Sequence, residues 1–187
     1  MIKDFETMAK SNRLAWNEAS IYHQAARKNS LYDGFSQIDF TVFDRDCDSV
    51  LLEKLNRIDL EGKMIAQLPC NNGRKLLSLM RFGAKHSVGF DISDEAVKEA
   101  RKLADIFGMD ADFHRMNALE IPTEHNGLYD FIYISEESLQ WFPDLQKYFS
   151  VVFRLLRNGG SLLIFEMHPF AYFFILRLGA GERYVSL

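Results

Sequence analysis

The stretch MIAQLPCNNGRKLLSLMRFGAKHSVGFDIS, residues 64–93, decides the fold. It opens with a short apolar run that stops at Pro69, as a buried strand does. Residues 74–82 then repeat apolar side chains at helical spacing, and Gly83 follows as a helix-terminating glycine would. A second apolar run covers residues 86–90. A strand, a helix and another strand in this order predict two parallel strands joined by a right-handed crossover.

The same alternation continues toward the C-terminus. Ser93 is a good cap for a following helix, whose first turn is acidic and suits the helix dipole. We expect helices over residues 93–107 and 144–157, the second closed by Asn158-Gly159-Gly160, and strands over residues 111–116, 128–134 and 161–167. The sequence therefore predicts an α/β fold, a doubly wound and mostly parallel sheet with helices on both faces.

The first 60 residues predict a helical, loop-rich segment in front of the sheet. Residues 12–28 carry small and apolar side chains on one helix face, which we expect to point inward: Ala15, Ala19, Tyr22 and Ala26. Asn12 is placed to cap this helix, and a second helix is expected over residues 49–57. We divide the chain into a helical lid, residues 1–60, and a core, residues 61–187, within one structural domain.

Length and composition exclude several classes of protein. The chain has 187 residues, which fits one domain, and a formal net charge of −4, which disfavours binding to nucleic acid through its phosphates. Cys47 and Cys70 build no disulfide framework, and the five scattered histidines show no metal-binding spacing, so we expect no metal. The most apolar tract, residues 169–178, contains Arg177 and is too short to span a membrane. Without a signal peptide, we expect a cytoplasmic protein that binds no membrane.

Asp91 follows the second predicted strand, at the edge of the sheet where open parallel sheets bind ligands. It comes 18 residues after Gly73, close to the spacing of about 20 that places an acidic group on a ribose. A carboxylate can accept hydrogen bonds from both ribose hydroxyls. The alternative is that Asp91 only begins the turn before the next helix. The order of loop, helix and strand favours the ribose contact.

Four segments, taken together and in order, resemble the class I S-adenosylmethionine-dependent methyltransferases between Gly62 and Phe170. They are LPCNNG at residues 68–73, VGFDIS at 88–93, YDFIYISE at 129–136 and LLRNGG at 155–160. EMHPF, residues 166–170, is similar to the end of the fifth strand in a bacterial subgroup of that family. The resemblance implies a Rossmann-like fold, S-adenosylmethionine as the cofactor, and transfer of a methyl group to a small-molecule acceptor.

The resemblance also implies which residues contact the cofactor. By their positions after the strands they are Gln67, Pro69, Cys70, Asn71, Gly73, Asp91, Ile92, Asn117, Ala118 and Ser135. Of these, Asp91 would bind the ribose, and Asn117 would accept a hydrogen bond from the adenine amino group.

The chain departs from the family at several of these positions. Members usually carry an acidic residue at Gln67, glycines at Pro69 and Asn71, and aspartate at Asn117. Gln67 and Asn117 keep acceptor oxygens but lose charge, and Asn71 tolerates a left-handed backbone. The family's sheet normally continues with a helix and two more strands, for which residues 171–187 are too few. We therefore expect the C-terminal strands of the family to be missing.

Methyl transfer from a sulfonium needs mainly in-line orientation and exclusion of water, so the sequence names no catalytic residue. The residues that we place on the substrate side are Trp16, Tyr22, Glu136, Trp141 and His168. His168 is either a base or a structural histidine, and the aromatic residues either wall the site or fill gaps beneath the lid.

Two other nucleotide-binding classes lack support in this sequence. Residues 71–76, NNGRKL, carry one glycine where a nicotinamide-dependent reductase needs Gly-x-Gly-x-x-Gly, and no Gly-Lys-Ser/Thr forms a phosphate loop. A rival from another class stays open. This rival is a catalytically silent methyltransferase-like domain that binds a nucleoside ligand or a partner protein.

Overall fold

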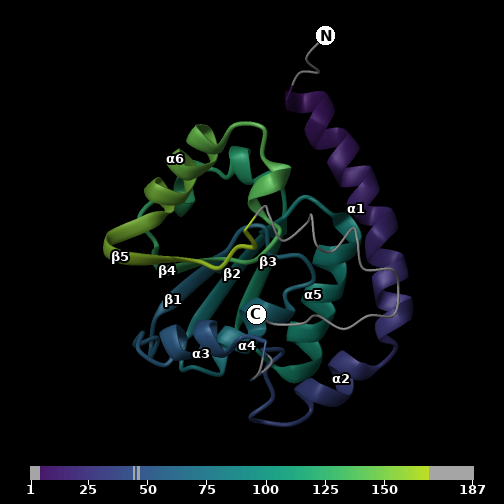
Figure 1. Ribbon diagram of the computed structural model, residues 1–187, viewed down its shortest axis with the longest axis vertical. Coiled ribbons are helices and arrows are strands. Elements are labelled where there is room, and N and C mark those ends of the chain that lie inside the picture. Colours follow the sequence, from purple (N-terminus) through teal and green to yellow (C-terminus); the bar gives the residue numbers. More distant parts are fainter. Residues whose placement is uncertain (1–4, 44, 46, 169–187) are drawn as a thin grey trace.

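The computed structural model describes residues 5–43, 45 and 47–168, which form an α/β fold around one sheet (Figure 1). The sheet has five parallel strands in the order β3-β2-β1-β4-β5. Their bounds are β1 Met64–Gln67, β2 His86–Asp91, β3 Ala111–Arg115, β4 Tyr129–Ile134 and β5 Leu156–Ile164. The strand order reverses between β1 and β4, where such sheets bind ligands. The predicted doubly wound parallel sheet is confirmed.

Helices cover both faces of the sheet. The helices are α1 Phe5–Arg27, α2 Ser30–Phe35, α3 Ser49–Leu55, α4 Arg74–Met80, α5 Asp94–Phe107 and α6 Leu145–Leu155, with single 3₁₀ turns η1 Ala118–Glu120, η2 Thr123–His125 and η3 Leu139–Trp141. Side chains alternate along each strand, so Ile65 and Phe131 pack with α3, α4 and α5, whereas Ala66 and Ile132 pack with α6 and η1. These two cores fix the strands whose ends carry the site.

Short capping interactions place the helices that follow the strands. Ser93 Oγ accepts a hydrogen bond from the Ala96 N–H at 3.2 Å, and Gly108 ends α5 in the left-handed region at φ 59°. An Asp144 carboxylate oxygen accepts from the Lys147 N–H at 2.8 Å at the start of α6. The predicted N-cap at Ser93 is confirmed, and Asp144 caps the helix that was expected to begin there.

The helix expected over residues 12–28 differs from α1 in its start and in its inward face. It begins at Phe5, so Asn12 lies inside the helix and caps nothing. Ala15 and Ala26 are exposed and Tyr22 is 70% exposed, whereas Ser20 is the buried residue of this helix. The expected inward face is wrong because α1 runs beside α5 (Figure 1) and meets polar groups there, so its polar side chains turn inward.

The junction of α6 and β5 also differs from the sequence prediction. The helix ends at Leu155 and the strand begins at Leu156, several residues before the start expected at Ser161. Tyr129 of β4 pairs with Leu156 and Phe131 pairs with Ser161, so the residues between them form an irregularity in β5. The segment Asn158-Gly159-Gly160, which we expected to end the helix, lies in this irregularity instead. Gly159 adopts φ 77° there, a left-handed conformation that suits glycine.

The helices of the described part of the chain are all too short or too polar to cross a membrane. The expectation that the C-terminal strands of the family are missing concerns residues 171–187, which lie outside the described residues.

Candidate functional site

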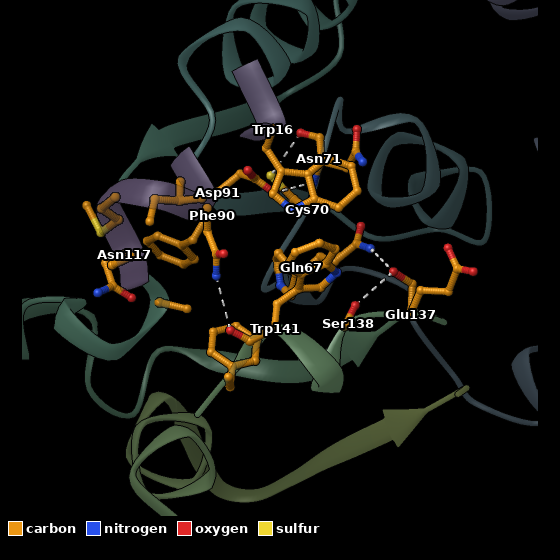
Figure 2. A pocket seen from close by; sticks show the side chains of 18 of the residues that line it. Trp16, Gln67, Cys70, Asn71, Phe90, Asp91, Asn117, Glu137, Ser138 and Trp141 are labelled. Carbon is orange, nitrogen blue, oxygen red and sulfur yellow. Dashed lines mark hydrogen bonds between the residues drawn. The ribbon is translucent and has the colours of Figure 1, made fainter. Parts of the chain in front are cut away.

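A cavity of about 190 Å³ lies at the carboxyl ends of the strands, where the strand order reverses (Figure 2). Gln67 ends β1, Asp91 ends β2 and Ser135 directly follows β4, and all three line it. The first half of α1 forms another wall, through Phe5, Met8, Ala9, Asn12 and Trp16. The predicted location of the site at this edge of the sheet agrees with the structure.

Asp91 is buried, with 8% of its surface exposed, and anchors the loop after β1. One carboxylate oxygen accepts from the Asn71 N–H at 2.7 Å, and the other accepts from the Ser93 N–H at 2.9 Å. Burial raises the pKa of Asp91, although these backbone hydrogen bonds oppose the shift. A carboxylate offers about four acceptor positions, so Asp91 retains capacity for a ligand hydroxyl in the cavity.

The loop between β1 and α4 takes its shape without the glycines that are usual there. Asn71 adopts a left-handed backbone at φ 49°, and its side-chain oxygen accepts from the Asn72 N–H at 2.7 Å. Gly73, at φ 73°, does not line the cavity. A Cβ there would lie 2.7 Å from the Phe113 ring and 2.9 Å from Ala100 Cβ, so Gly73 lets α4 start against its neighbours rather than against a ligand.

Apolar side chains line the cavity near the ends of β2 and β3. Phe90, Ile92, Met116 and Leu119 line it, and the Phe90 ring is stacked on His114 with the centroids 5.4 Å apart. Asn117 lines it too, and its side-chain oxygen accepts from the Leu119 N–H at 3.1 Å as the cap of η1. Phe90, Met116 and Leu119 were missed by sequence reasoning, because an apolar residue at a strand end has the same pattern as a core residue.

At the β1–β4 side, Gln67 is 1% exposed and donates from Nε2 to Ser135 Oγ at 3.2 Å. Ser135 Oγ in turn lies 3.4 Å from Ser138 Oγ. Lys75 and Glu136 form an ion pair beside them, with side chains 15% and 30% exposed. Arg74 and Lys75 line the cavity and were also missed, because the sequence does not show which helix residues face the strand ends.

Glu166, just beyond β5, fixes the rim that follows β4. Its carboxylate accepts from three successive backbone N–H groups, those of Glu137, Ser138 at 3.1 Å and Leu139 at 3.0 Å. Glu137 lines the cavity in a left-handed conformation at φ 62°. One side chain therefore holds the shape of this turn.

Two tryptophans close the outer wall. The Trp16 and Trp141 rings meet edge to face with centroids 5.1 Å apart, and Asn12 Nδ2 donates to the Trp141 carbonyl at 3.4 Å. Tyr22 does not reach this wall, since six residues beyond Trp16 the helix has turned its side chain about 120° away. His168 is exposed and does not line the cavity. The structure therefore does not bring Tyr22 and His168 to the cavity, and their substrate-side roles stay predictions.

Polar contacts attach α1 to α5 beside the cavity. The Arg13 guanidinium donates to both Asp94 oxygens, at 2.7 and 2.8 Å, and with Asn17 it lowers the pKa of Asp94 to about 2. Further along, Arg27 donates to Glu99 at 2.7 Å, and Glu99 also accepts from Asn72 of the cavity loop at 3.1 Å.

The structure brings most of the predicted site residues together around one cavity. They are Trp16, Gln67, Pro69, Cys70, Asn71, Asp91, Ile92, Asn117, Ala118, Ser135, Glu136 and Trp141. Gly73, Tyr22 and His168 are not among the residues that line it. Among the described residues, no group of three or more His, Cys, Asp or Glu side chains could hold a metal ion.

Residues 65–160 match the model of a methyltransferase domain family. Among proteins of similar sequence, the ubiquinone biosynthesis O-methyltransferase of Aromatoleum aromaticum is 28% identical over 137 residues, which cover 68% of this chain and 58% of that protein.

Solved structures show the same fold. The PH0226 protein of Pyrococcus horikoshii OT3 superposes with a TM-score of 0.59 at 21% identity, over 71% of this chain and 61% of that one. The geranyl diphosphate C-methyltransferase of Streptomyces coelicolor A3(2), in complex with Mg²⁺, geranyl diphosphate and S-adenosyl-L-homocysteine, superposes with a TM-score of 0.54 at 19% identity, over 63% and 45%. The chain thus spans about half the length of the proteins it matches.

Proposed function

This chain belongs to the class I S-adenosylmethionine-dependent methyltransferases, and from that premise we propose that it moves the cofactor's methyl group to a small-molecule acceptor by in-line displacement. The observation that carries the proposal is the cavity at the reversal of strand order. Asp91 lies at its β2 side and Gln67 at its β1 side, each at the end of a strand. This is the place where open parallel sheets bind nucleotides.

The residues of the cavity fit the nucleoside half of S-adenosylmethionine. The Asp91 carboxylate has acceptor capacity for the ribose hydroxyls, and the apolar slot of Phe90, Ile92 and Met116 suits a flat purine. Asn117 offers the remaining capacity of its side-chain oxygen to the adenine amino group.

The protein's contribution to the reaction is orientation and exclusion of water. The cofactor, when bound, supplies an electrophilic methyl group on a sulfonium sulfur. The edge-to-face pair of Trp16 and Trp141 covers the outer side of the cavity and limits the access of water to the methyl group. In this proposal residues 1–60 are the lid of the site and the chain from residue 61 is its core.

A small-molecule acceptor is supported by the relatives, one named for ubiquinone biosynthesis and one for geranyl diphosphate. We also propose that the protein acts in the cytoplasm.

Titration calorimetry with S-adenosylhomocysteine tests the cofactor site. Asp91→Ala should weaken binding by about 1.5–3 kcal/mol, the range for a hydrogen bond to a charged group. Asp39→Ala removes an exposed carboxylate that does not line the cavity and should bind as the wild type does. Unchanged affinity in Asp91→Ala would show that Asp91 does not bind the ribose.

The rival proposal is a catalytically silent domain that binds a nucleoside, and Pro69 and Asn71 in place of loop glycines favour it. Mass spectrometry of candidate acceptors incubated with S-adenosylmethionine separates the two. Methylated product supports the enzyme, whereas cofactor binding without any transfer supports the silent domain. Failure to bind S-adenosylhomocysteine at all would contradict both the cofactor assignment and the enzyme.

A further inference from the structure

One carboxylate oxygen is shared by the loop that lines the cavity and by helix α1. Glu99 Oε2 accepts from Asn72 Nδ2 at 3.1 Å and from Arg27 Nη2 at 2.7 Å. Asn72 lies in the loop between β1 and α4 and lines the cavity, whereas Arg27 is the last residue of α1. Glu99 itself lies in α5. A single atom therefore connects three elements of the fold.

This connection lies in the interior of the protein. Asn72 and Glu99 are buried, and Arg27 is partly buried. A carboxylate has no donor, so the amide nitrogen of Asn72 must face it, and the amide cannot turn over without losing the bond. Hydrogen bonds to a charged group are stronger than neutral ones, and little water reaches these groups to replace them. A shift of the loop therefore moves the carboxylate to which Arg27 is bound.

The loop residue before Asn72 contacts the predicted ribose residue. The Asn71 N–H donates to Asp91 at 2.7 Å, and the Asn71 side-chain oxygen accepts from the Asn72 N–H at 2.7 Å. A ligand that binds Asp91 and lies against this loop restricts Asn71 and Asn72 together. It therefore also restricts the donor that Asn72 offers to Glu99.

Arg27 is too far along α1 to contact a ligand in the cavity. The residues of α1 that line the cavity end at Trp16, and Arg27 lies eleven residues further, about 16 Å along the helix axis. An influence of Arg27 on ligand binding must therefore pass through the residues that it contacts.

Resting on the proposed function, we propose that Glu99 is a positioning residue that couples the cofactor loop to α1. When the cofactor fixes the loop, Glu99 holds the end of α1 against the core. When α1 is attached, Glu99 in turn holds Asn72 in place for the cofactor, because such coupling is reciprocal. Glu99 does not line the cavity, so it acts on the cofactor through Asn72.

A double-mutant cycle, measured by calorimetry of the full chain with S-adenosylhomocysteine, tests this coupling. Arg27→Met should weaken binding by about 5-fold or more, from the low end of typical coupling factors upward. Asn72→Ala interrupts the same connection at the loop. The double variant should bind within about 2-fold of the weaker single variant, because the connection can be interrupted only once.

Arg13→Met is the matched control. Arg13 also attaches α1 to α5 through an ion pair, but its partner is Asp94 and not Glu99. When Arg13→Met is combined with Asn72→Ala, the two fold-changes in affinity should multiply. This control separates coupling through Glu99 from a general loosening of α1.

Hydrogen exchange reads the coupling at its other end. S-adenosylhomocysteine should slow exchange in residues 17–27 of the wild type. In Asn72→Ala saturated with the same ligand, this added protection should be smaller, although the substitution lies outside α1. A merely structural role of Asn72 in its loop would leave the protection of α1 unchanged.

Circular dichroism establishes that each variant is folded, and Arg27→Gln takes the place of Arg27→Met if that variant is not. The inference is overturned if the folded Arg27 variant binds as the wild type does, or if its fold-change multiplies with that of Asn72→Ala. It is also overturned if Arg13→Met and Asn72→Ala fail to multiply, since the coupling would then belong to α1 as a whole. In these cases the cofactor site stands, whereas a wild type that does not bind S-adenosylhomocysteine contradicts the proposed function as well.

Discussion

Helices α6 and α1 are attached to the rest of the molecule by opposite kinds of contact. The first buries a stripe made of Tyr148, Val151, Val152 and Leu155. The second buries Ser20 and is held by the polar side chains of Arg13, Asn17 and Arg27. Water replaces half-exposed polar contacts at little cost but does not replace apolar burial. We infer that α6 belongs to the folding core, whereas α1 can leave and return over a folded sheet, as a lid must.

Tyr148 gives the most direct test of this comparison. Its ring is fully buried, and the ring centroid lies 4.0 Å from that of Phe142. Its hydroxyl donates a hydrogen bond to the Leu68 carbonyl. Tyr148→Ala should lower the free energy of unfolding by about 3–5 kcal/mol, because it leaves a large cavity in the α6 core. Urea unfolding followed by circular dichroism measures this. Phe153→Ala, on the same helix at 69% exposure, should change it by no more than about 0.5 kcal/mol. Similar losses of unfolding free energy in both variants would contradict the inference that the buried face of α6 belongs to the folding core.

The ion pair of Arg27 with Glu99 is the most buried polar contact of α1 described above, because the Glu99 side chain is only 8% exposed. Arg27→Met should lower the free energy of unfolding by about 1–3 kcal/mol, since Glu99 then loses its ion pair and keeps Asn72 as a hydrogen-bond donor. The same urea assay measures it, with the exposed Arg57→Met as the control. A change indistinguishable from that of Arg57→Met would mean that the whole of α1 is loosely attached.

The smallest effect is a pH-dependent loosening of α1. The pKa of Asp94 lies at about 2, below its usual 3.8, because Arg13 and Asn17 bind the charged form. Because its pKa is depressed, charged Asp94 stabilises the attachment of α1 above about pH 4, and this stabilisation is lost as the pH falls toward 2. Hydrogen exchange, corrected for its intrinsic pH dependence, should therefore accelerate in α1 before it does in α6. Asp94→Asn should remove this dependence, and simultaneous loss of protection in both helices would argue against a separate lid.

The strands and most helices could be predicted because burial controls their residue pattern. Strands β1 and β4 are short and mostly apolar runs. Ser93 and Asp144 cap the starts of α5 and α6, and Gly108 ends α5. The inward face of α1 could not be predicted in this way. Its partner is the polar start of α5, so the residues facing inward are Arg13 and Asn17, and apolar periodicity identifies the wrong side.

The site was predictable where function follows from position along the chain. Asp91 and the loop before α4 come directly after strands, and parallel strands bring their ends to one edge. The state of a side chain's partners is not visible in a sequence. Three-dimensional packing alone leaves Gln67 and Glu136 each with an unpartnered side-chain oxygen and turns Arg74 toward the cavity.

The Glu166 carboxylate has a consequence for engineering. It fixes the turn after β4 through backbone N–H groups, so the shape of that turn depends little on the side chains of residues 137–139. A library at position 137, which lines the cavity, restricted to residues tolerant of positive φ, such as glycine or asparagine, would retain the scaffold. Acceptor preference can then be selected at this rim without redesigning the nucleoside half of the pocket.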